Sequence, residues 1–306
     1  MKKFLLRLCL FLAAFYVINS AAAFWLAERI CRNIGDKYHW VCHKKNVTAD
    51  YVFVGSSRVE LGIDPRIIDE VTGGTSINLG VSGGGAADQY LLLKKFLDSN
   101  EASCVLLQLD YITLSDYFSY PFRDYVWLSY DTDAAIRSAL IDYRGVTKYG
   151  LWKAIPFLRF MEFSSQYILY LDHRPPIDSP FDEAMGAQRR ETPFPGSEDD
   201  SYVQFHESDL AVKYIRLIVE LCRKKHVRLI AFEAPFPKKI EQKANREGSD
   251  ARINDIVAES NLTLWDFSRD FYDHDDYFYD KHHMNSLGVD AFSTILGEKL
   301  AESGSK

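Results

Sequence analysis

Three residues with complementary chemistry lie near the two ends of the sequence. Ser57 follows the apolar run Tyr51–Val54, whereas Asp280 and His283 lie in the late stretch DYFYDKHHMN. A histidine can take the proton of a serine hydroxyl, and a carboxylate can hold the imidazole in the tautomer that this requires. Residues three apart share one face of a helical turn, so Asp280 can orient His283. These side chains could carry out covalent acyl chemistry if the fold brings the chain ends together.

Two adjacent hydroxyls compete for the role of nucleophile, because Ser56 and Ser57 both follow Gly55. Successive side chains at the end of a strand point in opposite directions, and this alternation favours Ser57 over Ser56. Arg58 could pair with an acid or an anionic substrate, and Asn285 could brace the turn that holds His283. An exposed arginine and a turn-capping asparagine are the simpler interpretations of these two residues.

Strands and helices alternate along most of the chain and predict how these residues are positioned. Asp64-Pro65 supplies a helix start that Gly73-Gly74 ends, and the glycine-rich stretch 80–85 follows a second strand. The predicted strands are 51–54, 75–79, 104–109, 227–232 and 262–267, with helical apolar spacing around 91–96, 211–222 and 287–296. This pattern predicts an α/β fold, a flavodoxin-like three-layer parallel sheet with helices on both faces and ligands at the carboxyl ends of the strands.

Residues 111–205 interrupt this alternation. They combine an aromatic-rich stretch, an amphipathic stretch from Trp152 to Leu171 and a proline-punctuated polar loop. A segment of this length is too long for a simple connection, so we expect an inserted, partly helical cap. Its aromatic residues could stack on sugars or pack against the sheet, and packing is favoured because aromatic side chains carry large apolar surfaces.

The N-terminal segment is basic and then apolar. Lys2, Lys3 and Arg7 precede the run from Leu8 to Leu26, which Asn19 and Ser20 interrupt. A helix over this run would reach roughly 28 Å, close to the ~30 Å of a hydrocarbon core. A cleaved signal peptide is the alternative, but the apolar character resumes after the alanines and Trp25 suits the far interface, which favours an anchor. The expected organisation is an anchor or signal peptide at 1–30, a stalk at 31–48 and an exported domain at 49–303.

The composition of the chain excludes some classes of binding partner. The net charge is −7, and no cluster of lysine and arginine provides the basic surface that nucleic acid requires. Cys31 and Cys42 could form a disulfide or remain two thiols, and no cysteine and histidine spacing indicates structural zinc. We expect no nucleic acid, no cofactor and no metal.

The ordered motifs resemble those of the SGNH/GDSL hydrolase superfamily, over about 50–300. These motifs are Gly55-x-Ser57 after the first strand, Asn78-x-x-x-x-Gly83 after the second and the terminal Asp280-x-x-His283. The Gly-Ser-Ser turn, the N-terminal anchor and His283-Met284-Asn285 are similar to a membrane-anchored cell-envelope branch, which includes proteins of teichoic acid D-alanylation and alginate O-acetylation. The resemblance implies an SGNH hydrolase fold with Ser57 as nucleophile, His283 as base and Asp280 as its orienting carboxylate. The backbone N–H groups of Ser57 and Gly83 would stabilise the oxyanion.

The resemblance implies that the protein is an acyl esterase or O-acyltransferase that acts on cell-envelope or secreted polysaccharide. The expected partners are an acylated carbohydrate or other acyl donor and a membrane-bound O-acyltransferase. The expected location is a bacterial inner membrane, spanned once, with the catalytic domain outside the cytoplasm, or a secreted form after cleavage.

One motif departs from the family pattern. The third block normally supplies an asparagine side chain to the oxyanion, but this chain reads Gln108-Leu109-Asp110-Tyr111 at that place. Loss of one such donor can slow hydrolysis by two or three orders of magnitude. The Tyr111 hydroxyl or a residue of the cap could replace it. The departure fits a slow acyltransferase and also an inactive anchored scaffold that binds glycan.

A metal-dependent hydrolase is a further alternative. Acidic and histidine side chains crowd the late segment and could coordinate a divalent cation; they are Asp270, Asp273, His274, Asp275, Asp276, Asp280, His282 and His283. A solvated loop is the simpler interpretation, because a metal cage would also need ligands from other strands. An α/β-hydrolase is disfavoured, since Gly55-x-Ser57-x-Val59 lacks the second glycine of the nucleophile elbow.

Overall fold

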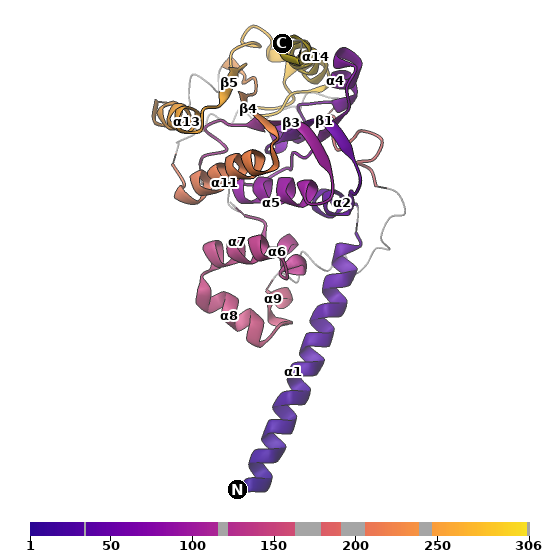
Figure 1. The fold of residues 1–306 in the computed structure, drawn as a ribbon, viewed down its shortest axis with the longest axis vertical. Coiled ribbons are helices and arrows are strands. Elements are labelled where there is room, and N and C mark those ends of the chain that lie inside the picture. Colours follow the sequence, from indigo (N-terminus) through magenta and orange to yellow (C-terminus); the bar gives the residue numbers. More distant parts are fainter. Residues whose placement is uncertain (34, 116–121, 163–178, 191–205, 239–246, 305–306) are drawn as a thin grey trace. The chain divides into compact units, whose positions relative to one another are not determined.

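A computed structural model describes the whole chain except residues 34, 116–121, 163–178, 191–205, 239–246 and 305–306. The chain divides into two compact units (Figure 1). One comprises Met1–His39 and Arg123–Ser179, and the other comprises Trp40–Phe122 and Pro180–Lys306. The second unit contains the sheet and all of the residues singled out above for chemistry.

The sheet has five parallel strands in the order β2-β1-β3-β4-β5. They are β1 (Thr48–Val54), β2 (Ser76–Asn78), β3 (Glu101–Gln108), β4 (Arg228–Glu233) and β5 (Thr263–Asp266). This is the flavodoxin-like strand order, and the five predicted strands and the predicted fold class are confirmed. The strands are apolar without alternation over their buried ends, as expected for a parallel sheet covered on both faces.

Helices cover the two faces of this sheet. On one face α5 (Ala86–Leu97) packs against α11 (Asp209–Lys225), and on the other α4 (Pro65–Thr72) packs against α14 (Ser286–Gly304) (Figure 1). The Asp64 side chain caps α4 at the predicted start, and Gly73 ends it in the left-handed conformation with φ 71°. Phe292 and Leu296 of α14 lie in the buried core with Phe53 and Leu106 of the sheet. The remaining helices of this unit are α3 (Ser57–Glu60), α13 (Glu247–Ser260) and the short η2 (Asp275–Tyr277). Helix α2 (Lys37–His43) spans the boundary between the two units in sequence.

The other unit is helical in its described part. It contains α1 (Lys2–Cys31), α6 (Asp124–Trp127), η1 (Leu128–Tyr130), α7 (Ala134–Arg144), α8 (Val146–Ala154) and α9 (Leu158–Met161). Helix α1 has a mean hydropathy of 1.9 over its most apolar window and is long and apolar enough to cross a membrane. Its last third packs against η1, with Ala23, Leu26, Ala27 and Ile30 buried. An apolar helix of this kind fits either a signal anchor or a signal peptide.

Candidate active site

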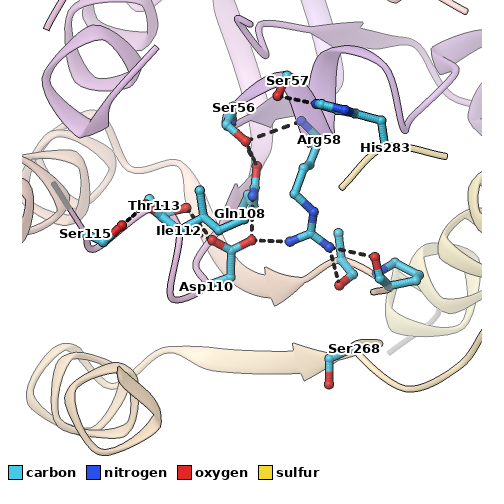
Figure 2. Close-up of polar contacts among 12 residues, drawn as sticks. Ser56, Ser57, Arg58, Gln108, Asp110, Ile112, Thr113, Ser115, Ser268 and His283 are labelled. Atoms are coloured by element: carbon cyan, nitrogen blue, oxygen red, sulfur yellow. Dashed lines mark hydrogen bonds and ion pairs between the residues drawn. The ribbon is translucent and has the colours of Figure 1, made fainter. Parts of the chain in front are cut away.

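Ser57, His283 and Asp280 form a hydrogen-bonded chain. The Ser57 Oγ lies 2.8 Å from Nε2 of His283, as Figure 2 shows, and His283 Nδ1 lies 2.8 and 2.9 Å from the two carboxylate oxygens of Asp280. An ionised carboxylate only accepts hydrogen bonds, so Nδ1 carries the proton and Nε2 is left to accept from the serine hydroxyl. The fold thus brings together residues from the two ends of the chain in the order that proton transfer requires.

The position of Ser57 follows from the way β1 ends. Ser56 caps the short helix α3, because its Oγ accepts a hydrogen bond from the backbone N–H of Arg58 at 3.3 Å. Gly55 precedes this turn, and a Cβ there would lie 2.3 Å from Cγ2 of Val59. Only glycine therefore fits between the strand and the helix. Ser57 is partly exposed, whereas Ser56 is 2% exposed, so a substrate can reach only the Ser57 hydroxyl directly.

Asp280 and His283 lie in a hairpin turn, and the predicted helical turn is wrong. Phe278 and Met284 form an antiparallel bridge, and the Tyr279 N–H donates to the carbonyl of His283 at 2.8 Å. Inside the turn, one oxygen of Asp280 accepts the backbone N–H groups of His282 and His283 at 2.7 and 2.9 Å. The carboxylate therefore holds both the backbone and the imidazole ring, which gives the i and i+3 contact without a helix.

The charge state of Asp280 suits this arrangement. Burial alone would raise its pKa, but the hydrogen bond and the charge of His283, with the two backbone N–H groups, outweigh it and lower the pKa to about 2. Asp280 is therefore a carboxylate at neutral pH. It can stabilise an imidazolium on His283 when that ring takes a proton from Ser57.

Ser56 is held by the third strand instead of by the histidine. Its N–H and its Oγ both donate to Oε1 of Gln108, at 2.9 and 3.0 Å (Figure 2). The amide nitrogen of Gln108 donates in turn to Asp110 at 2.6 Å. Gln108 thus connects the turn after β1 to the end of β3. Sequence reasoning noted Gln108 only as a departure from the family pattern, because contacts between strand ends leave no local signal.

Arg58 is buried and paired, and its interpretation as an exposed arginine is wrong. Its side chain is 3% exposed and forms an ion pair with Asp110, which is fully buried. The other guanidinium nitrogen donates to the carbonyls of Ala234 and Pro235 at 2.8 and 2.6 Å, and the group stacks over Phe236. Asp110 also accepts the N–H and the hydroxyl of Thr113, each at 2.9 Å. We refer to Ser56, Arg58, Gln108, Asp110 and Thr113 as the buried polar network.

The glycine-rich turn after β2 is held by side chains from both sides. The Asn78 amide donates to the carbonyls of Val59 and Ile63 at 2.8 and 2.9 Å and accepts the N–H of Gly80 at 2.8 Å. Glu60 accepts the N–H of Ser82 at 2.6 Å and also its hydroxyl. Gly83 has φ 67°, in the left-handed region that glycine favours. Asn78 is therefore a buried brace, and the role of Gly83 as an oxyanion donor stays a prediction.

The two other supporting candidates are also buried. Tyr111 is 2% exposed and stacks on Phe236, with ring centroids 5.1 Å apart. Asn285 joins η2 to α14, because its amide donates to the carbonyl of Asp276 at 2.6 Å and accepts the N–H of Gly288 at 3.2 Å. Asn285 thus braces the segment that follows His283.

His282 lies beside the chain of three residues. Burial of its ring, followed by the nearby charges of Arg58 and His283, lowers its pKa to about 4. The ring is neutral at pH 7 and so adds no charge beside His283. Among the described residues, no group of three or more histidine, cysteine and acidic side chains has a geometry that could hold a metal ion. Cys31 and Cys42 form no disulfide with each other.

Comparisons with known proteins give distant structural similarity. The chain matches no family model and no curated protein. It is similar to a lipase/acylhydrolase from Enterococcus faecalis, with 10% identity over 83% of this chain and 96% of that chain and a TM-score of 0.42. It is also similar to a GDSL-like lipase from Bacteroides thetaiotaomicron, with 10% identity over 83% and 89% of the two chains and a TM-score of 0.40. An acetyl xylan esterase, AlAXEase, matches at 12% identity over 83% and 98%, with a TM-score of 0.40. The order of the five parallel strands, β2-β1-β3-β4-β5, defines the fold class.

Proposed function

We propose that this protein is a serine-dependent acyl esterase or O-acyltransferase of the SGNH type. The observation that carries the proposal is the hydrogen-bonded chain from Ser57 through His283 to Asp280. A serine hydroxyl is a weak nucleophile at its own pKa, and a neighbouring imidazole that can take its proton is the usual means of activation.

The proposed reaction begins when Ser57 Oγ attacks the carbonyl carbon of an acyl ester or thioester. Its proton moves to Nε2 of His283, and Asp280 stabilises the resulting imidazolium. The N–H groups of Ser57 and Gly83 are the proposed donors to the oxyanion. Nε2 then returns the proton to the leaving group, and the acyl group remains on Ser57.

The second half of the reaction releases the acyl group. Water or a sugar hydroxyl gives its proton to Nε2 of His283 and attacks the acyl-enzyme, and collapse of the intermediate returns that proton to Ser57. With water the net reaction is ester hydrolysis, and with a sugar hydroxyl it is acyl transfer. The third-block aspartate, Asp110, accepts hydrogen bonds from three partners and so cannot act as the donor that the family asparagine supplies.

The proposed substrate is an acylated polysaccharide of the cell envelope or a secreted one, and the proposed location is a single-pass membrane protein with its site outside the cytoplasm. The apolar helix α1 supports the proposed location, and the resemblance to the cell-envelope branch supports the proposed substrate. A membrane-bound O-acyltransferase is the proposed partner in transfer. Acceptor assays with acetylated and unacetylated sugars would separate hydrolysis from transfer.

The test uses a fluorophosphonate probe and mass spectrometry of the intact protein. We expect a single adduct on the folded wild-type chain, no adduct on Ser57→Ala and a retained adduct on Ser56→Ala, the matched control at the adjacent hydroxyl. An adduct that persists in Ser57→Ala would identify a different nucleophile. No adduct on a folded wild-type chain would favour the inactive scaffold that binds glycan. Activity that is lost with a chelator would favour the metal-dependent alternative.

A further inference from the structure

Helix α1 presents two different faces between Asn19 and Ile30. Asn19 and the buried residues Ala23 and Ile30 lie on the face that packs against the other helices of its unit. Phe24 and Trp25 lie on the opposite side and are 67% and 59% exposed. The helix is therefore bound to protein on one side while its other side presents aromatic surface to the surroundings.

The contact at Asn19 fixes the depth of a second segment. Its side-chain oxygen accepts the backbone N–H of Phe157 at 2.9 Å, so the corner between α8 and α9 lies beside this point of α1. A tryptophan at the end of a spanning helix lies at the membrane interface. Asn19 precedes Trp25 by six residues, and at 1.5 Å per residue it lies roughly 9 Å deeper in the bilayer. The corner, residues 155–158, then lies below the interface as well.

This corner has the properties that a hydrocarbon environment demands. Its sequence is Ile-Pro-Phe-Leu, without a polar side chain, and all four residues are partly exposed. Lipid offers no hydrogen bonds, so each backbone N–H must find an acceptor in the protein. The N–H of Ile155 donates to the carbonyl of Leu151 at 2.9 Å and that of Leu158 donates to Ile155 at 3.0 Å. Pro156 has no N–H, and Phe157 donates to Asn19.

The same contact explains the polar residue in the apolar helix. An asparagine in a spanning segment is costly unless its side chain is hydrogen-bonded within the protein. Here the amide oxygen of Asn19 and the N–H of Phe157 satisfy each other. The amide oxygen of Asn19 and the N–H of Phe157 would each be unfavourable alone in lipid, but their hydrogen bond allows both to lie there.

We propose that the α8–α9 corner, residues 155–158, inserts among lipid acyl chains beside α1. Its occupant is lipid because the corner continues the exposed apolar surface of α1 and leaves no backbone N–H from Ile155 to Leu158 without an acceptor. Met161, at the end of α9, is 60% exposed and extends this apolar surface. The helical unit is thus held at the membrane by two segments, and this inference does not depend on serine chemistry.

The test maps contacts with a phosphatidylcholine that carries a diazirine in its acyl chain, using the unmodified full chain in nanodiscs. Trypsin cleavage after Lys153 and Arg159 releases the corner as peptide 154–159, and cleavage after Arg137 and Arg144 releases the control peptide 138–144 from α7 in the same unit. Peptide 8–29 of α1 is the positive control. We expect lipid adducts on 8–29 and on 154–159, the latter about tenfold above 138–144, because a reagent in the acyl chains reaches only groups at that depth.

Adducts on 8–29 without adducts on 154–159 would overturn the inference, since the corner would then face water or protein. Equal labelling of 154–159 and 138–144 would also overturn it, because insertion would not be specific to the corner. A single chain per nanodisc ensures that a second copy does not shield the corner. Absence of adducts on 8–29 would show that α1 does not span, and the inference would fall with it.

Discussion

Replacing Arg58 with methionine tests whether the buried polar network holds the turn that carries Ser57. The change preserves much of the side-chain volume but removes the ion pair with Asp110 and both hydrogen bonds to the carbonyls after β4. The side chains of Arg58 and Asp110 are 3% and 0% exposed, so the carboxylate would remain buried without its cation. Breaking a buried pair in this way costs about 3–5 kcal/mol. We expect Arg58→Met to lower the free energy of unfolding of the sheet unit by that amount.

Hydrogen exchange of β1 and β3 amides is the suitable assay, because a chain of two units does not unfold in one transition. Arg216→Met is the matched control. Its arginine pairs with Glu259 on the surface, with side chains 43% and 53% exposed, and such pairs contribute about 1 kcal/mol or less. The double variant Arg58→Met with Asp110→Leu removes both charges, and we expect it to be less destabilised than the sum of the single changes.

The reasoning would be refuted if Arg58→Met lowered the free energy of unfolding no more than Arg216→Met does. Strict additivity in the double variant would also refute it, since a charge pair must couple its partners. The rate of fluorophosphonate labelling of Ser57 adds a functional measurement. Arg58→Met should slow this labelling, because the network ends on Ser56, the residue before Ser57.

Three further changes test other parts of the structure. The low pKa of Asp280 stabilises the fold above pH 4, and this contribution is lost as the pH falls from about 4 to 2. The difference in free energy of unfolding of the sheet unit between wild type and Asp280→Asn, measured by hydrogen exchange across pH, should therefore shrink by about 1–2 kcal/mol over that window. Gly55→Ala should destabilise the sheet unit by about 1–3 kcal/mol and slow probe labelling by about two orders of magnitude, because the new Cβ would meet Val59. Gly150→Ala on α8 is the control, since a Cβ there has open space, and it should be neutral or stabilising. Asn19→Leu should leave a backbone N–H of the α8–α9 corner without an acceptor and cost about 1–3 kcal/mol, seen as faster exchange confined to the helical unit.

The fold was largely predictable because its signals are local. Continuous apolar runs predicted all five strands, and turn residues such as Asp64 and Gly73 marked the ends of α4. The meeting of Ser57 and His283 could be anticipated for a topological reason. In a parallel sheet the loops after every strand lie at one edge, so residues distant in sequence converge there.

The buried polar network was not predictable from the same signals. Arg58 and Gln108 lie next to strand ends, where polar residues commonly face solvent, and nothing local distinguishes a buried arginine from an exposed one. Their burial follows from contacts between the loops after β1, β3 and β4, which depend on register. The prediction of a helical turn at Asp280 failed because the sequence gives only the separation of Asp280 and His283. Side chains three positions apart can meet in a helical turn and also in the observed hairpin.

The hairpin that carries His283 leads directly into α14, which is the last helix and packs against α4 near the beginning of the sheet unit. During synthesis, Ser57 emerges long before His283, whose imidazole it contacts in the folded chain. The hydroxyl of Ser57 in a nascent chain therefore has no imidazole partner. The hydrogen bond between Ser57 and His283 can form only after the segment that leads into α14 has folded onto the sheet unit, so under the proposed mechanism reactivity would arise only near the end of folding.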